Sequence, residues 1–484
     1  MIGMSTRWRS MGIAALAWGL VLPGTVLAQS GGIAGVVKDT SGAVLPGVTV
    51  EASSPALIER VRVVTTDSEG QYKIIDVNPG VYSVTFSLAG FASVKREGIE
   101  LTTAFTATVN AELPVGAVTE TISVSGATPV VDVQNVVQQS VMTHEVIDSL
   151  PTGKMLVNLA TLVPGMLMNV SGGGGAAADV GGSVGERYTM FQIHGGRTDG
   201  EFRVEGLSIE NFTAGSSKGS ASHHINTGSI EEMTFETDNQ PVERENGGPS
   251  TNIIPKDGGD RYTGSFFVAG TNSKFENSNL TPALINRGLT AVSRIDKIWD
   301  FNPSVGGPVM LHRLWFFGSA RHWGTDNFVA GDYYNQIDYT KTPQSFAYVP
   351  DLSRQAVDNL TQTAETLRLT WQATPRNKFA TYLHNENRCS CHDSIVSGSL
   401  IKSPEATGSE NFKGPSYFAS VTWSAPVTNR FMLEGGYLRL YDNRPLTPAE
   451  PTTAPDLIGV FETSANLWYR ASQPGTPYVT KTTG

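Results

Sequence analysis

Apolar and polar side chains alternate with a period of two along most of the chain, a pattern that predicts β-strands. Tyr82, Val84 and Phe86 share one face of such a strand, and Ser83 and Thr85 lie on the other. A later strand repeats the period with Ala107, Val109, Ala111 and Leu113. Turn-forming sequences separate these strands at Thr40–Gly42, Pro46–Gly47, Asp67–Gly70 and Asn78–Gly80. Short strands at this spacing predict an all-β sandwich for residues 29–115.

Two short helices are predicted further along the chain. The first covers Thr143–Leu150 and ends before Pro151. The second places its apolar side chains at i, i+3, i+4 and i+7, at Leu156, Leu159, Ala160 and Val163. Pro164-Gly165 ends the second helix.

Longer alternating strands follow in residues 256–484. Leu367, Leu369 and Trp371 alternate with Arg368 and Thr370, and residues 417–424 show the same period. Apolar and aromatic side chains on one face with polar ones on the other are typical of outer-membrane barrel strands. A soluble sandwich predicts the same alternation, so periodicity alone does not distinguish the two.

Connection lengths favour the barrel. Short turns are predicted at Gly306–Pro308, Thr374–Asn377 and Pro426–Asn429. Long polar segments, expected to be loops, lie between them at Thr271–Arg294, Asp326–Ala364 and Asn385–Pro415. Short turns on one side and long loops on the other are the arrangement of antiparallel transmembrane barrels.

The N-terminus indicates export. Arg7 and Arg9 precede an apolar run, Met11–Leu22, and small or compact residues end at Ala28. This run is too short to span a bilayer, which needs about 20 apolar residues. Residues 1–28 are therefore expected to be a cleaved signal peptide.

Composition narrows the class of protein. The formal net charge of −10 gives no reason to expect nucleic acid as a partner. Two cysteines exclude a disulfide-dense scaffold, although export permits a disulfide.

Residues 30–115 resemble the carboxypeptidase regulatory-like domain. The similarity is carried by Gly35–Asp39, Leu45–Val50, Thr66–Tyr72 and Pro79–Tyr82. The resemblance implies no peptidase, and the segment contains no histidine from which a zinc site of the His-and-Glu kind would be built.

Residues 136–255 resemble the plug domain of TonB-dependent outer-membrane receptors. The matching motifs are Leu150–Lys154, Leu162–Gly165, Ile193–Arg197, Phe202–Gly206, Ser229–Met233 and Thr251–Gly258. The family usually has Asp at the position of Glu205 and a Thr-Lys-Ser-Gly type of exit where this chain has Pro255–Gly258. Residues 306–319 resemble an early hairpin of the Oar-like subgroup. The resemblance implies that residues 136–255 form an α+β plug domain, followed by a partial antiparallel transmembrane β-barrel.

The barrel is expected to be incomplete. The alternation accounts for about eight strands, whereas plugged transporter barrels have about 22. We therefore expect residues 256–484 to be the first strands of the barrel and the sequence to be an N-terminal fragment.

A linker is predicted at residues 116–135, between sandwich and plug. Its stretch Glu120, Thr121, Ile122, Ser123, Val124 and Ser125 resembles a TonB box in position and composition. An extended strand of this kind can add to a sheet of a partner through main-chain hydrogen bonds. A plain interdomain linker is the alternative.

Other motifs carry weaker signals. Gly181–Gly185 and Gly215–Gly219 match G-x-S-x-G but lack the strand-then-helix context of a nucleophile elbow. Metal binding by His223-His224 is the alternative to an exposed loop pair, and the exposed pair is expected because no further ligand cluster accompanies it. Cys389 and Cys391, with His392 and His384 nearby, indicate a small disulfide at a loop tip, with two free thiols or a soft-metal site as alternatives.

The sequence therefore predicts a non-enzymatic outer-membrane receptor with no catalytic residues, cofactor or metal. Its expected partners are TonB with the inner-membrane energising complex, outer-membrane lipid, and an unidentified small ligand such as a siderophore, oligosaccharide or peptide. The sandwich and plug are expected on the periplasmic side. An Oar-like structural or adhesive surface protein without transport is the alternative.

Overall fold

The computed structural model describes most of residues 31–483. Outside the described residues lie 1–30, 58–59, 103–104, 117–120, 126–138, 169–181, 184, 186–188, 195–199, 210–219, 222, 238–247, 279, 290, 394, 398–399, 412–415, 429–430, 450–456, 472–478 and 484. The expected signal peptide falls among these. Within the described part, none of the helices has the length and apolar character needed to cross a membrane.

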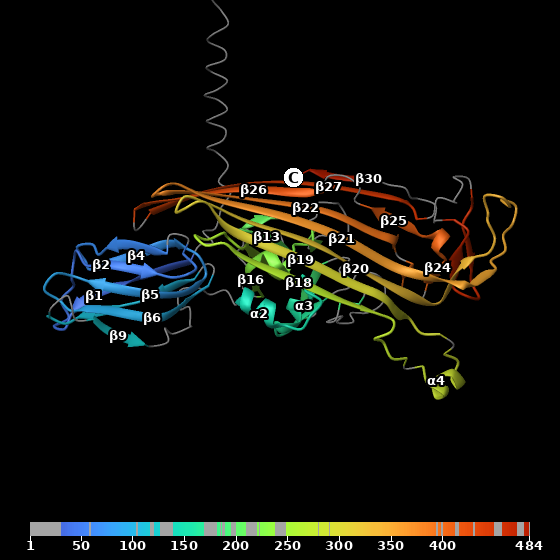
Figure 1. Cartoon of the computed structure of the whole chain (residues 1–484), viewed down its shortest axis with the longest axis horizontal. Helices are drawn as coiled ribbons and strands as arrows, with labels where there is room; N and C mark the ends of the chain where they lie inside the picture. Colours follow the sequence, from blue (N-terminus) through green and yellow to red (C-terminus); the bar gives the residue numbers. More distant parts are fainter. Residues whose placement is uncertain are drawn as a thin grey trace, which may run out of the picture.

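The N-terminal domain is a sandwich of two sheets (Figure 1). One sheet contains β4 (Gln71–Val77), β1 (Gly31–Asp39), β7 (Thr106–Thr108) and β8 (Ala111–Leu113). The other has the order β3 (Val61–Thr65), β2 (Thr49–Ser53), β5 (Gly80–Ser87), β6 (Ser93–Leu101) and β9 (Thr121–Ser125).

The predicted alternation accounts for the sandwich core. Tyr82, Val84 and Phe86 are buried between the sheets, and the rings of Tyr72 and Phe86 meet edge-on with centroids 5.6 Å apart. The four alternating residues from Ala107 to Leu113 are buried as expected. Ala107 lies in β7 and Ala111 and Leu113 lie in β8, with Val109 between the two strands. There the Asn110 side chain accepts a hydrogen bond from the Val36 amide.

The plug region, residues 139–255, combines short helices and two small sheets. Its helical segments are α2 (His144–Ser149), α3 (Leu156–Leu159), η1 (Ala160–Leu162) and η2 (Thr227–Ser229). One sheet has the order β10 (Gln139–Thr143), β16 (Ile230–Glu236), β17 (Ser250–Pro255), β13 (Glu201–Val204) and β14 (Leu207–Ser208). The other has the order β11 (Met166–Met168), β12 (Thr189–Ile193) and β15 (Ser220–Ala221).

Both predicted helices form, and their apolar faces are buried. Leu156, Leu159, Ala160 and Val163 are each at most 3% exposed. They belong to a core that also contains Tyr382, Phe418 and Leu440 of the large sheet. The plug region and the large sheet therefore share one hydrophobic core.

A nine-stranded sheet curves over the plug region (Figure 1). Its first five strands are β18 (Thr263–Asn272), β19 (Arg294–Met310), β20 (Leu314–Asn335), β21 (Pro350–Thr374) and β22 (Asn377–Asp393). The others are β25 (Gly408–Asn411), β26 (Tyr417–Thr428), β27 (Phe431–Pro448) and β30 (Val479–Thr483). All pairings in this sheet are antiparallel.

Smaller elements complete the fold. Helix α4 (Pro282–Asn286) lies between β18 and β19, and η3 (Pro404–Ala406) precedes β25. A separate four-stranded sheet has the order β23 (Val396–Ser397), β24 (Leu400–Lys402), β29 (Leu467–Tyr469) and β28 (Val460–Glu462).

Several predicted loops and turns are wrong. β20 and β21 extend through much of the segment expected to be a loop at Asp326–Ala364, and β22 continues to Asp393. Main-chain hydrogen bonds to neighbouring strands keep these segments extended. Polar side chains on both faces therefore do not prevent strand formation. Gly306–Pro308 lies inside β19, whose turn comes after Met310. The tight turn at Thr374–Asn377 is confirmed, and the turn after β26 lies outside the described residues.

The two faces of the large sheet differ as predicted. Leu367, Leu369 and Trp371 are 39%, 37% and 50% exposed, whereas Arg368 and Thr370 are buried. The predicted fold class, a β-dominated chain with a sandwich, an α+β plug and an antiparallel sheet of long strands, is confirmed.

Candidate functional site

The predicted TonB box is part of the sandwich in this structure. Glu120 lies outside the described residues, and Thr121–Ser125 form β9. β9 runs parallel to β6, with Ser93 opposite Thr121 and Glu97 opposite Ser125. It is the last strand in the order of its sheet, so its second edge has no strand partner among the described residues.

Arg321, on the inner face of β20, fastens the large sheet to the plug region. Its side chain is 2% exposed, and its Nη2 donates to Asp300 Oδ2 of β19 at 2.6 Å. Nη1 donates to the Lys154 carbonyl at 2.8 Å, and Nη2 also donates to the Gly153 carbonyl at 3.1 Å. The ion pair with Asp300 orients the guanidinium towards the loop between α2 and α3. The carbonyls of this loop do not accept hydrogen bonds within a helix.

Arg368, on the same face of β21, makes a second link to the plug region. Its Nη2 donates to Glu205 Oε1 at 2.6 Å, and its Nε donates to Asp257. Glu205 and Gly206 connect β13 to β14, and both have positive φ (50° and 79°). A two-residue hairpin with positive φ at both positions matches the right-handed twist of its strands. This turn places Glu205 against the sheet.

Asp257 joins three parts of the chain. Besides Arg368 of the large sheet, it accepts hydrogen bonds from Thr370 Oγ1 at 2.6 Å and from Asn78 Nδ2 of the sandwich at 3.2 Å. Burial raises the pKa of the Asp257 carboxyl, but Arg368 and Thr370 outweigh burial and the pKa lies below its ordinary value. The carboxylate is therefore charged at neutral pH.

The sandwich also contacts the rim of the large sheet. Lys378 Nζ of β22 lies 2.9 Å from Asp76 Oδ1, and Ser424 Oγ donates to Asp76 Oδ2 at 3.0 Å. A cavity of about 120 Å³ lies where sandwich, plug region and sheet meet. Its charged lining residues are Asp76, Glu205, Asp257, Arg368, Lys378 and Glu434.

The interpretation of His223-His224 as an exposed pair is wrong. Both residues are buried, at 0% and 3% exposure. Glu386 of β22 accepts from the His224 amide at 2.8 Å and lies 3.0 Å from its Nδ1. His384 stacks on Phe418 with ring centroids 5.0 Å apart. Nothing local to residues 223–224 predicts this burial, because the covering residues come from strands about 160 positions away.

His223 and His224 of the plug region and His384 of β22 form a histidine cluster, which is a contact between the plug region and the large sheet. Gln362 donates to Glu386 at 3.1 Å, which adds β21 to the same network. Among the described residues, no group of three or more His, Cys, Asp or Glu side chains is arranged to hold a metal ion.

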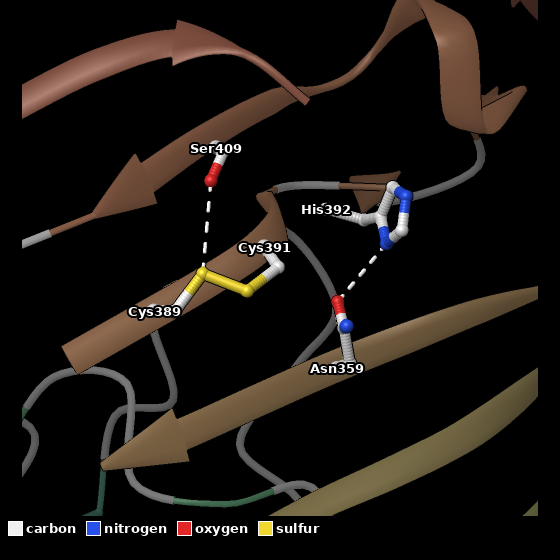
Figure 2. Close-up of a disulfide and its surroundings, with 5 residues drawn as sticks. All are labelled: Asn359, Cys389, Cys391, His392 and Ser409. Atoms are coloured by element: carbon white, nitrogen blue, oxygen red, sulfur yellow. Dashed lines mark hydrogen bonds between the residues drawn. A yellow bond between two sulfur atoms is a disulfide. The ribbon is translucent and has the colours of Figure 1, made fainter. Parts of the chain in front are cut away.

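Cys389 and Cys391 form the predicted disulfide (Figure 2). They lie within β22, so the expected position at a loop tip is wrong. Cys389 Sγ is 3.7 Å from Ser409 Oγ of β25. His392 lies apart from the sulfur atoms, with Nδ1 3.0 Å from Asn359 Oδ1 of β21 (Figure 2). The bond closes a small ring within one strand.

The G-x-S-x-G matches show no catalytic arrangement in the described residues. Gly215–Gly219 lies outside those residues, and in Gly181–Gly185 only residues 182, 183 and 185 are described. The Ser183 carbonyl accepts from Asn327 of β20 at 2.6 Å, and the next element that the structure describes is the strand β12.

Sequence reasoning missed Arg321 and named Arg368 only as a member of an alternating strand. The position of Arg368, on the face of its strand opposite the apolar side chains, was the feature of the sequence that could have identified it. The carbonyl partners of Arg321 carried no signal, because they depend on how the plug helices turn.

Comparisons with known proteins agree with this architecture. Residues 32–114 match the carboxypeptidase regulatory-like domain family. Over 322 residues, 64% of this chain, the sequence is 27% identical to the TonB-dependent transporter Oar of Myxococcus xanthus. The chain is a homologue of a TonB-dependent transporter. Both resemblances predicted from sequence are thereby confirmed. The chain spans 28% of the length of this curated relative.

Two solved structures are similar in part. The outer membrane transporter YddB from Escherichia coli aligns over 63% of this chain and 39% of its own, at 14% identity and a TM-score of 0.44. A mutant of the ferric enterobactin receptor from Pseudomonas aeruginosa, in complex with enterobactin, aligns over 72% of this chain and 45% of its own, at 12% identity and a TM-score of 0.43.

Proposed function

We propose that this protein is a TonB-dependent outer-membrane receptor that imports a scarce ligand by energy-coupled rearrangement of its plug. The observation that carries the proposal is the plug region held against the inner face of a large antiparallel sheet by buried charged contacts. Homology to a TonB-dependent transporter over 322 residues supports it.

The outer face of the large sheet fits a lipid environment. Its exposed side chains include Phe266, Val268, Leu367, Leu369, Trp371, Leu383, Val421, Phe431 and Tyr437. Outward apolar side chains alternating with inward polar ones are the pattern of transmembrane barrels. We place the protein in the outer membrane, with the sandwich and plug region on the periplasmic side.

The contacts between sheet and plug region are suited to a plug that is held firmly and then released. Arg321 donates to the Gly153 and Lys154 carbonyls of the plug region, and Arg368 donates to the Glu205 carboxylate. Such pairs are costly to break, because separation leaves a charge without a partner in a poorly solvated site. Work supplied by TonB and its inner-membrane complex at residues 120–125 would provide that energy.

Import of this kind requires no covalent chemistry, so we propose that the protein is not an enzyme and uses no catalytic residue or cofactor. The ligand would be a siderophore, an oligosaccharide or a peptide bound by the outer loops and plug.

Growth and uptake separate transport from the alternative of an Oar-like structural or adhesive surface protein. A deletion strain should lose growth on one scarce nutrient source, and a TonB deletion should lose growth on the same source. Radiolabelled uptake of that nutrient should then depend on both genes. Normal growth on every source tested, with altered cell adhesion alone, would contradict transport.

A further inference from the structure

A further cavity, of about 370 Å³, lies where β3 and β4 of the sandwich meet the rim of the large sheet. The rim contributes the turn between β21 and β22 and the last residues of β26. β4 lies on the side of the sandwich towards the large sheet (Figure 1), and Asp76 near its end pairs with Lys378 of the rim. The volume is in the range of about 300–1,000 Å³ that small-molecule sites have.

Basic side chains dominate the charged lining of this cavity. Among the described residues that line it, Asp76 is the only acidic one, and four are basic: Arg62, Lys73, Arg376 and Lys378. The lining therefore has a net charge of +3, in a chain whose formal net charge is −10. Asp76 is already compensated, because it pairs with Lys378 and accepts a hydrogen bond from Ser424. A concave surface with this excess of positive charge attracts anions.

Two of the basic residues are available to an anion. Lys73 and Arg376 are exposed, and neither forms an ion pair with a residue that the structure describes. Arg62 is held in place, since it donates to the Ile75 and Asp76 carbonyls at 2.6 and 2.7 Å. Ammonium and guanidinium groups are the side chains that bind phosphate in proteins. The charge of the cavity therefore fits a phosphate group.

An aromatic row on the outer face of the large sheet sets the level of the rim in the membrane. Trp371 of β21 and Trp423 of β26 are both opposite Phe379 of β22 in the register. The rings of Trp371 and Phe379 are stacked with centroids 5.7 Å apart. Transmembrane barrels have such aromatic girdles at the membrane interfaces. Pro375 of the turn is four residues beyond Trp371, which for a tilted strand is about 10 Å further towards the periplasm. The turn therefore lies at the level of the lipid headgroups.

The cavity also has an apolar border beside its basic residues. Pro375, Pro426 and Val427 of the rim line it, and the Val427 side chain is 38% exposed. A free phosphate ion would gain nothing from this border. A phospholipid has both an anionic phosphate and apolar chains, so it matches both parts of the lining.

We propose that this cavity binds the phosphate of an anionic phospholipid headgroup from the periplasmic leaflet, and that Lys73 and Arg376 contact the phosphate. The lipid would then join the sandwich to the rim beside the pair of Asp76 and Lys378. Basic residues near a membrane surface attract anionic lipids in this way. The inference rests on the proposed outer-membrane placement with the sandwich on the periplasmic side, and it does not require transport.

Binding of phosphatidylglycerol to the full-length protein in detergent, measured by native mass spectrometry, tests the inference. We expect Lys73→Gln with Arg376→Gln to weaken the binding of the first phosphatidylglycerol about tenfold. Lys73→Arg with Arg376→Lys keeps both charges and should bind as wild type. Zwitterionic phosphatidylcholine should bind wild type and the glutamine variant equally.

Lys38→Gln with Arg287→Gln is the matched control for loss of charge. Both residues are exposed, and neither lines the cavity. This variant should bind phosphatidylglycerol as wild type does.

Two results would overturn the inference. Equal affinity of wild type and the variant with Lys73→Gln and Arg376→Gln for phosphatidylglycerol would show that the lipid does not bind in this cavity. Displacement of phosphatidylglycerol by an equal concentration of inorganic phosphate would show that the site takes a free anion instead of a lipid. Both results would leave the proposed import standing, because TonB-dependent uptake is measured in separate experiments on cells.

Discussion

At the scale of single residues, two arginines on the inner face of the large sheet decide how the plug region is held. Both are buried, and each combines a carboxylate partner with a second contact. Arg321 donates to main-chain carbonyls of the plug region, whereas Arg368 binds the carboxylates of Glu205 in the plug region and of Asp257, which follows that region. Substitution of each arginine in turn should therefore separate the contribution of Arg321 to stability from that of Arg368.

Arg321→Met should destabilise the protein strongly. The change leaves Asp300 buried without its partner, and loss of one member of a buried pair costs about 3–5 kcal/mol. We expect a clear fall in the thermal denaturation midpoint of the detergent-purified protein. Asp300→Leu combined with Arg321→Met should recover part of the loss, because no isolated charge remains.

Lys297→Met is the matched control for this change. Lys297 is 57% exposed and pairs with Asp326 at 3.1 Å, so its removal should cost less than about 1 kcal/mol. Equal falls in the midpoint for Lys297→Met and Arg321→Met would refute the role of Arg321 as a buried anchor.

His144 should make the stability of the plug region depend weakly on pH. Glu231, 3.2 Å away, raises the pKa of the His144 imidazole above its ordinary value of 6.5, against the opposing effect of burial. A raised pKa in the folded state means that the stabilisation is complete below pH 6.5 and is lost as the pH rises through the folded-state pKa. Both side chains are about one-third exposed, so the effect should stay below about 1 kcal/mol.

The measurement compares the denaturation midpoints of wild type and His144→Gln across pH. The wild type should be the more stable at about pH 5.5, and the difference should shrink towards about pH 8.5. A difference that grows with pH would mean that the neutral imidazole is the stabilising form.

At the scale of elements, alternation predicted the strands well and their ends poorly. The buried face of β5 and the outward face of β21 followed from a period of two, because one side of each strand meets an apolar environment. The ends of β20, β21 and β22 did not follow, since both faces there carry polar residues and main-chain pairing alone sets the length.

The candidate site was only partly predictable for a related reason. The strand character of Thr121–Ser125 could be inferred from the residues, but its pairing with β6 could not. Burial of His223 and His224 depends on strands distant in sequence, and no local pattern encodes that contact.

The contact between sandwich and sheet should weaken when its ion pair between Lys378 and Asp76 is removed. Lys378→Met removes the ion pair with Asp76 without changing the sandwich and leaves the hydrogen bond from Ser424 to Asp76 in place. It should loosen the turn that carries Asn78. Hydrogen–deuterium exchange of residues 76–80 in the full-length protein should become faster. Lys341→Met, which changes an 81% exposed lysine in an outer loop, should leave that exchange unchanged. Unaltered exchange in Lys378→Met would show that the contact does not hold the sandwich.

At the scale of the whole molecule, the chain forms a continuous line of contacts from the candidate TonB box to the plug region. β9 pairs with β6, the sandwich contacts Asp257 and Lys378, and Arg368 joins Asp257 to Glu205. Energy applied at one end of this line would reach the residues that hold the plug. The central claim is that residues 121–125 receive that energy.

Proline substitution in β9 tests this claim most directly. Neighbouring residues of a strand direct their amides to opposite edges. Two single variants, Ile122→Pro and Ser123→Pro, therefore each remove the main-chain donor from a different edge of β9. Ile122→Ala and Ser123→Ala keep the amides and serve as controls.

The measurement is ligand uptake by energised cells, with crosslinking to the TonB periplasmic domain recorded in parallel. We predict that at least one proline variant loses both uptake and crosslinking, while surface expression and ligand binding persist and both alanine variants behave as wild type. Uptake at the wild-type rate in both proline variants would contradict the account.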